Sequence, residues 1–105
     1  MLPPVTTMVD VDAPLDVAAS LAEMRLVLGL AAGLRTELVI ECDPNLPAVR
    51  YDAGELRRTL MELVDRAAVA LADRGQIVVR ATVGSGRVVV LAVGDDATLY
   101  LPVWN

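Results

Sequence analysis

The segment that decides the fold is residues 52–83, which read DAGELRRTLMELVDRAAVALADRGQIVVRATV. Asp52 is a favoured helix N-cap, and Glu55 follows three positions later, as in a capping box. Apolar residues then recur with helical spacing, which predicts a helix over Ala53–Ala72. Its expected buried face consists of Leu56, Leu60, Leu63, Val64, Ala67 and Leu71. Gln76–Val83 follows as an expected strand.

A second helix is expected upstream of this segment. Asp12 stands shortly before Pro14, and this combination marks a helix start, so the sequence predicts a helix from Pro14 to about Ala32. Gly33 follows as the expected C-terminal cap. One apolar stripe runs along this helix and contains Val17, Leu21, Met24, Leu28 and Ala31.

Short extended segments are expected beside these helices. Val5–Val11 and Glu37–Cys42 are rich in β-branched residues and predict strands. Residues 43–47 form a turn cluster, and Ala48–Tyr51 is a short extended piece.

The C-terminal third of the sequence predicts strands joined by turns. Arg87–Val93 and Thr98–Trp104 are strands, and the first is apolar on both faces, so it should lie centrally in a sheet. On the last strand, alternation sends Leu99, Leu101 and Val103 towards the helices, and Tyr100 and Trp104 to the outer face of the sheet. There the two aromatic residues form a self-association or partner interface, or Trp104 folds over the sheet edge. The expected fold is an α/β two-layer sandwich, a mixed sheet covered on one face by two helices, forming a single domain over residues 1–105.

The composition of the chain argues against several classes of function. The net charge is −5, aromatic residues are few, and the basic residues are scattered arginines, which argues against nucleic-acid binding. The chain has no histidine and one cysteine, so it contains neither a Ser-His-Asp nor a Cys-His catalytic set. Cys42 is expected to be an ordinary small strand residue. No segment reads as a membrane span or a secretory signal, and we expect a cytoplasmic location.

Several stretches, taken in order, resemble the ATPase domain of bacterial sensor histidine kinases. They are LPAVRYD at 46–52, LRRTLMELVDRA at 56–67, RGQIVV at 74–79, VGDDA at 93–97 and LYLP at 99–102. Together they cover nearly the whole chain in the order that this family shows. The resemblance implies a Bergerat-like α/β sandwich.

The positions that matter for nucleotide binding depart from that family. Its helix holds Mg²⁺ through an acidic or polar residue and an Asn four positions later, and the matching residues here are Glu62 and Arg66. A guanidinium has no lone pair to offer, so Arg66 cannot ligate the metal. Asp95 matches the Asp that binds adenine, but Ala97 and Leu99 replace the glycines of that box. The family's mobile lid over the nucleotide has no counterpart, so the sequence predicts a domain without an ATP lid.

These residues also allow simpler interpretations, which stay open at this point. Arg58, Glu62 and Arg66 lie at i, i+4 and i+8, so they can form an ion-pair ladder on an exposed helix face or contact a partner. Asp95 and Asp96 suit an ordinary turn as well as a residual adenine contact.

The resemblance implies a non-catalytic interaction domain of two-component signalling that uses no ATP, metal or other cofactor. It is similar in this respect to the pseudo-ATPase domain of histidine phosphotransferases. The expected partner is a response regulator, a histidine kinase or a second copy of the chain, with neither nucleic acid nor membrane involved. The candidate partner-binding residues are Arg58, Glu62, Arg66, Tyr100 and Trp104.

Two other interpretations remain. The chain can be a reduced nucleotide-binding domain of the kinase type that still uses Glu62 and Asp95. It can also be a structural fragment of a longer sensor kinase.

Overall fold

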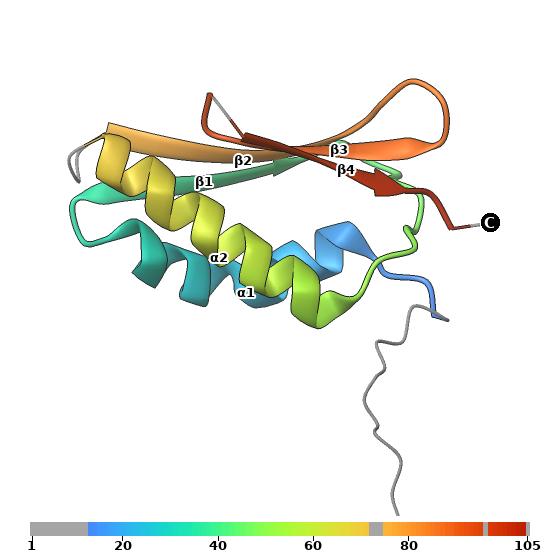
Figure 1. Ribbon diagram of the computed structural model, residues 1–105, viewed down its shortest axis with the longest axis horizontal. Helices are drawn as coiled ribbons and strands as arrows, with labels where there is room; N and C mark the ends of the chain where they lie inside the picture. The colour runs from blue at the N-terminus through green and yellow to red at the C-terminus, as the bar shows by residue number, and fades with distance from the viewer. Residues whose placement is uncertain (1–12, 72–74, 96, 105) are drawn as a thin grey trace, which may run out of the picture.

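The computed structural model describes residues 13–71, 75–95 and 97–104. The elements follow the order α1 (Val17–Ala32), β1 (Thr36–Cys42), α2 (Ala53–Ala70), β2 (Gly75–Val83), β3 (Val88–Val93) and β4 (Ala97–Pro102). Figure 1 shows two layers, with the four strands in one sheet and both helices on the same side of it. The expected mixed α/β sandwich is therefore confirmed. The strand expected over Val5–Val11 lies outside the described residues.

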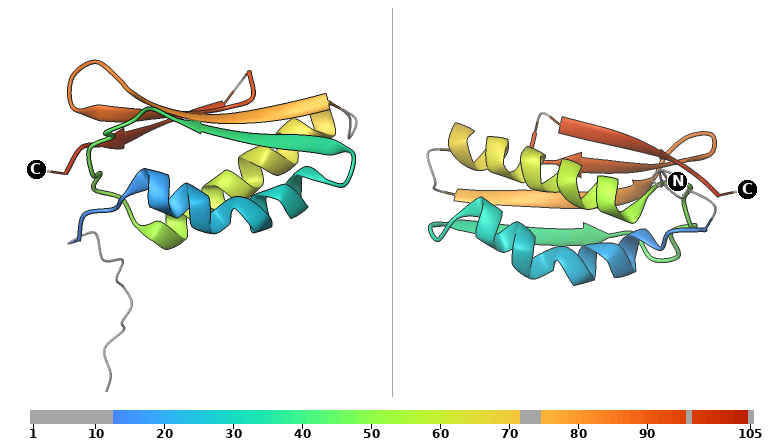
Figure 2. Two further views of the ribbon diagram at one scale, coloured as in Figure 1. Left: turned by 180° about the vertical axis from the view of Figure 1, so that it is seen from behind. Right: turned by 60° about the horizontal axis from the view of Figure 1, so that its bottom comes forward.

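The order of strands follows the order of the chain. β1 and β2 are parallel, β2–β3 and β3–β4 are antiparallel, and the order in the sheet is β1-β2-β3-β4. A parallel pair needs a crossover connection, and α2 supplies it. β3 lies between two strands, as its apolar sequence predicted. Figure 2 shows α1 and α2 side by side across the sheet, and among the strands α1 contacts mainly β1.

The helix start predicted at Pro14 is wrong by three residues. α1 begins at Val17, and its N-cap is Asp16, whose Oδ1 accepts a hydrogen bond from Ala19 N at 3.0 Å. The cause is a tertiary contact: Leu15 is held extended by two backbone hydrogen bonds with Val49, of 2.9 and 3.0 Å. A residue held in this extended pairing cannot also form the first turn of a helix.

Other helix ends agree more closely with the sequence. Gly33 caps α1 with φ 98, a value that suits glycine, and its N–H donates to Gly29 O. Asp52 caps α2, since its Oδ2 accepts from Glu55 N at 2.9 Å. α2 ends at Ala70, two residues before the predicted end.

The core lies between the helices and the facing side of the sheet. The predicted stripes need correction at both helices. Ala32 is fully buried and Ala31 only partly. On α2, Ala68 is buried, Leu63 and Ala67 are partly buried, and Leu71 is exposed. Within the part described, neither helix is long and apolar enough to cross a bilayer. The fully buried large side chains are Leu21, Leu28, Leu56, Leu60, Ile77, Leu91, Leu101, Val17, Val49, Val64, Val79 and Val89.

The opposite side of the sheet, which we call the outer sheet face, is covered by no described segment (Figure 1). Its centre is apolar and its β1 margin is polar, with the Glu41–Arg80 ion pair at 2.6 Å. The apolar and hydroxyl residues of this face are Val39, Val78, Thr82, Val88, Val90, Ala92, Thr98, Tyr100 and Pro102.

We expect Gly84→Ala to destabilise the fold. A Cβ at Gly84 would lie 2.6 Å from Val90 Cγ2 and 2.9 Å from Val88 Cγ2, and these β-branched side chains are stiff. The free energy of unfolding, measured by urea denaturation, should fall by about 1–2 kcal/mol. Ser85→Ala at the exposed neighbouring position is the control and should change it by less than about 0.5 kcal/mol. Equal stability of the two variants would show that this hairpin packs differently.

Candidate functional site

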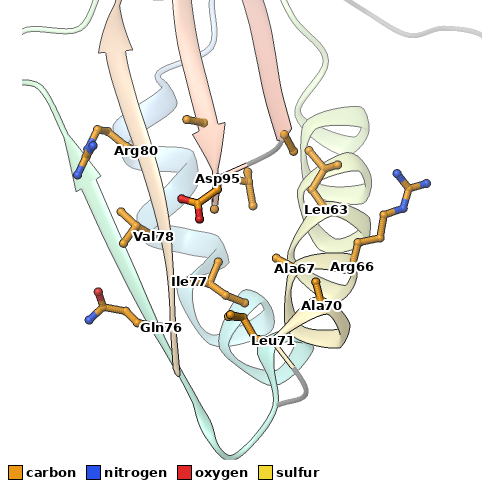
Figure 3. Close-up of a pocket in the computed structure, with 14 residues that line it drawn as sticks. Leu63, Arg66, Ala67, Ala70, Leu71, Gln76, Ile77, Val78, Arg80 and Asp95 are labelled. Carbon is orange, nitrogen blue, oxygen red and sulfur yellow. The ribbon is translucent and has the colours of Figure 1, made fainter. Parts of the chain in front are cut away.

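A cavity lies where the resemblance places the nucleotide. It has a volume of about 470 Å³ and opens between the C-terminal half of α2, the start of β2 and the turn between β3 and β4 (Figure 3). Arg66, Asp95 and Ala97 all contribute to its lining. The structure therefore brings together three of the four nucleotide-site positions that the sequence singled out.

The inner wall of this cavity is apolar. α2 contributes Leu63, Ala67 and Ala70, Leu71 follows the helix, and Ile77 rises from β2 (Figure 3). Sequence analysis assigned Leu63 and Leu71 to the core of the fold. They do belong to the apolar face of α2, but that face extends past the end of β3 and there borders an open space.

The charged groups around the cavity do not converge on it. Arg66 is exposed, and Figure 3 shows its guanidinium directed away from the cavity. The Arg80 guanidinium is engaged by Glu41, with Nη2–Oε1 at 2.6 Å and Nε–Oε1 at 2.8 Å. Asp95 is an exposed carboxylate on the turn, and it would repel a phosphate placed beside it. This wall is suited to an apolar group more than to a triphosphate.

Glu62 does not line this cavity. It is exposed on α2, one helical turn before Arg66, and it forms no ion pair with another described residue. The ion-pair ladder of Arg58, Glu62 and Arg66 does not form, because Glu62 pairs with neither arginine and Arg58 Nη2 pairs with Glu55 Oε2 at 2.7 Å. Glu55 lies three residues earlier and is within reach on the same helix face.

The glycine of the β3–β4 turn has a structural role. Gly94 adopts φ 63, and its N–H donates to Val78 O at 2.9 Å, so it both reverses the chain and extends the pairing with β2. Ala97 is already a residue of β4, paired with Val93. A strand residue in this position needs no glycine, which explains the alanine.

Tyr100 and Trp104 lie in different surroundings. Tyr100 is 66% exposed on the outer sheet face, opposite Val90. Trp104 follows the end of β4, is half-buried, and has the Arg50 guanidinium 4.4 Å from its ring centroid. Sequence analysis missed Arg50, because this contact depends on the pairing of residues 48–50 with 102–104 and no local pattern signals it.

Cys42 is not an activated thiol. Partial burial, with the negative charges of Asp43 and Asp16, raises its pKa, so the thiol stays protonated at neutral pH. Within residues 13–71, 75–95 and 97–104, no group of three or more acidic or cysteine side chains is arranged to hold a metal ion.

No family model matches the chain, and no curated protein matches it.

We expect Arg66→Asn, which restores the residue type of the kinase family, to create no Mg²⁺-dependent nucleotide binding. Glu62, the other metal position of the kinase family, lies outside the cavity, so one new ligand would not complete the pair that the family uses to hold the metal. Calorimetric titration with Mg-ATP should show no heat of binding up to about 1 mM nucleotide. A dissociation constant of 1 mM corresponds to a binding free energy of about −4 kcal/mol. Arg58→Asn, on the same helix, is the matched control. Binding by Arg66→Asn alone would show that a complete nucleotide pocket survives.

Proposed function

We propose that this protein is a non-catalytic protein-interaction domain of two-component signalling, located in the cytoplasm, which does not use ATP. Its partner is the receiver domain of a response regulator, with a histidine kinase as the other candidate. The proposal combines the ordered resemblance to the kinase ATPase domain with the surfaces that the fold leaves open.

The main support for the proposal is the composition of the outer sheet face. It presents a central band of valines from three strands, and the exposed Tyr100 stands on β4 beside them. An apolar area of this kind, bordered by the Glu41–Arg80 pair, has the composition of a protein-binding surface, in which tyrosine often serves as the anchor.

The cavity supports the absence of ATP use. A triphosphate needs donors and a cation that converge on it. Here Arg66 is directed outwards and Arg80 is already paired, while Asp95 adds negative charge. The overall charge of −5 also opposes an anionic ligand.

A second candidate is a reduced nucleotide-binding domain of the kinase type. One observation favours it: the cavity lies at the expected place, and Asp95, the counterpart of the adenine-binding Asp, lies on its lining. An adenine ring could pack against Leu63 and Ile77 without phosphate contacts. This candidate predicts that adenosine binds as well as ATP does.

We expect the protein to bind Mg-ATP and ADP with dissociation constants weaker than about 100 μM. Each charge-assisted phosphate contact that is missing removes about 1.5–3 kcal/mol, and the cavity offers no replacement. Isothermal titration calorimetry with Mg-ATP, ADP and adenosine measures this directly. A dissociation constant below about 100 μM for Mg-ATP, where binding exceeds roughly 5 kcal/mol, would contradict the proposal. Comparable binding of adenosine would favour the second candidate.

We expect Tyr100→Ser to weaken capture of the partner by about 30-fold or more, since truncation of an aromatic anchor costs about 2 kcal/mol or more. Immobilised protein is exposed to the receiver domains and histidine kinases of the source cell, and bound species are identified by mass spectrometry. Val69→Ser, equally exposed on α2 at 70%, is the control and should capture the partner normally. Equal capture by both variants, or capture of neither protein class, would refute the proposal.

A further inference from the structure

β4 is an edge strand of the sheet, and only part of its outer edge is paired (Figure 2). Beyond the end of the strand, residues 48–50 lie along this edge, and Arg50 N donates to Pro102 O at 2.8 Å. Over residues 97–101, β4 pairs with β3, and no described residue pairs with its other side. We call this stretch the open β4 edge.

The backbone groups on the open β4 edge belong to Thr98 and Tyr100. In an antiparallel sheet, successive residues direct their N–H and C=O groups alternately towards one neighbouring strand and the other. Val103 N is bonded on the β3 side, to Arg87 O at 2.9 Å, whereas Pro102 O is bonded on the outer side. The N–H and C=O groups of Thr98 and Tyr100 therefore point outwards, and no described residue bonds to them there.

The two edge strands of the sheet differ in charge. β1 carries Glu37 and Glu41, and charged side chains are one means by which proteins keep an edge strand from pairing with another strand. β4 reads ATLYLP and contains no charged residue. Proline also discourages pairing, but Pro102 stands at the last position of β4, where the edge is already covered. The outward groups of Thr98 and Tyr100 thus have neither protection.

A second copy of β4 matches the open β4 edge in spacing. When a two-fold axis passes through Leu99, perpendicular to the sheet, the two strands run antiparallel, and Thr98 lies opposite Tyr100 of the second copy. Thr98 N then donates to Tyr100 O of the second copy, and Thr98 O accepts from its N–H. The axis repeats both bonds, so every outward group of the two residues has a partner in both copies.

The length of the open β4 edge favours a second copy over a longer strand. A strand that continued past Leu101 would run into residues 48–50. In the two-fold arrangement, Leu101 lies opposite Ala97 of the second copy, which is the first residue of its β4. The chain before Ala97 turns back into the sheet, since Gly94 N bonds to β2. Each strand therefore begins where the edge of the other becomes covered.

The side chains of β4 suit this pairing on both sides of the sheet. Leu99 is half-buried on the helix side, and among the strands α2 contacts mainly β2 and β3, so the outer part of Leu99 is left uncovered. Leu99 of the second copy would cover it, because residues opposite each other without mutual hydrogen bonds have Cα atoms about 4.5 Å apart. On the outer sheet face, the opposed Tyr100 and Thr98 form an aromatic–β-branched pair.

We infer that two copies of the chain associate through the open β4 edge, as an antiparallel two-fold pair centred on Leu99, and join their sheets into one. This inference goes beyond the proposed function and does not depend on it. The outer sheet faces of both copies lie on the same side of the joined sheet, where the Tyr100 side chains still face a partner. The paired segment is short, so the dissociation constant should be on the order of 100 μM.

Amide hydrogen exchange of the full chain, followed by NMR at about 20 μM and at about 1 mM, tests the pairing without any substitution. The amides of Leu99 and Leu101, which bond to β3, should be protected at both concentrations. Exchange at Thr98 and Tyr100 should slow about fourfold between the two concentrations, as the dimer forms. Sedimentation velocity over the same range should show the change from monomer to dimer.

Thr98→Pro tests the outward donor directly. Proline is tolerated on an edge strand where the missing N–H faces solvent, so the bonds between β4 and β3 should remain. In the dimer the change removes two of the intermolecular bonds, and the dissociation constant should rise about 30-fold or more. Thr98→Val keeps the N–H and the β-branched shape, and as the matched control it should dimerise like the wild type. Circular dichroism of both variants should match the wild type.

Three results overturn the inference. The first is a wild type that stays monomeric at about 1 mM, or a dimer in which exchange at Thr98 and Tyr100 does not slow. The second is protection of these two amides in the monomer at about 20 μM, since the edge is then paired within the chain. The third is equal dimerisation of Thr98→Pro and Thr98→Val. If Thr98→Pro fails to fold, the exchange measurement on the wild type decides alone.

Discussion

The packing of α2 against the sheet is the interaction on which the rest of the structure depends. Leu56, Leu60 and Val64 are fully buried there, and each contributes about 1.5–3 kcal/mol by leaving water. α2 is also the crossover that makes β1 and β2 parallel neighbours. In the described part of this 105-residue chain, α1 and α2 form the one layer of helices that covers the sheet. The described part of the molecule therefore has two layers, and each has a side without a covering element.

The uncovered side of the sheet, the uncovered side of the helices and the end of the sheet each have a different surface. The outer sheet face has an apolar centre with a tyrosine, and α1 exposes Leu26 and Leu30 on the helical side. The cavity lies at the end of the sheet, where β2 extends past β3 and β3 no longer lies beneath the apolar side of α2. Its apolar wall follows from the same periodicity that builds the core. In our account, the molecule acts through its outer sheet face, and the cavity is a result of unequal strand lengths.

Local chemistry made much of the fold predictable from sequence. Three predictions depended only on residues close in sequence, and the structure agrees with each. They are the N-cap formed by Asp52 with Glu55, the C-cap at Gly33, and the alternation along β4. The errors arose where distant segments meet. Leu15 is extended because Val49 holds it, and Trp104 is packed by Arg50, so neither could be read from neighbouring residues. For the site, the sequence identified Arg66, Asp95 and Ala97 as neighbours, but the direction of the Arg66 side chain and the exclusion of Glu62 required the three-dimensional arrangement.

The central claim, that this domain acts through its outer sheet face and not through its cavity, is tested most directly by amide chemical shifts of the ¹⁵N-labelled protein. Spectra are recorded with an excess of the receiver domain of a response regulator, and separately with excess Mg-ATP. Our account predicts that the receiver domain shifts the amides around Tyr100 and Val90, and that Mg-ATP leaves those of Ile77 and Gly94 unchanged. Saturable shifts at Ile77 and Gly94 with Mg-ATP, and none around Tyr100 with the receiver domain, would contradict it.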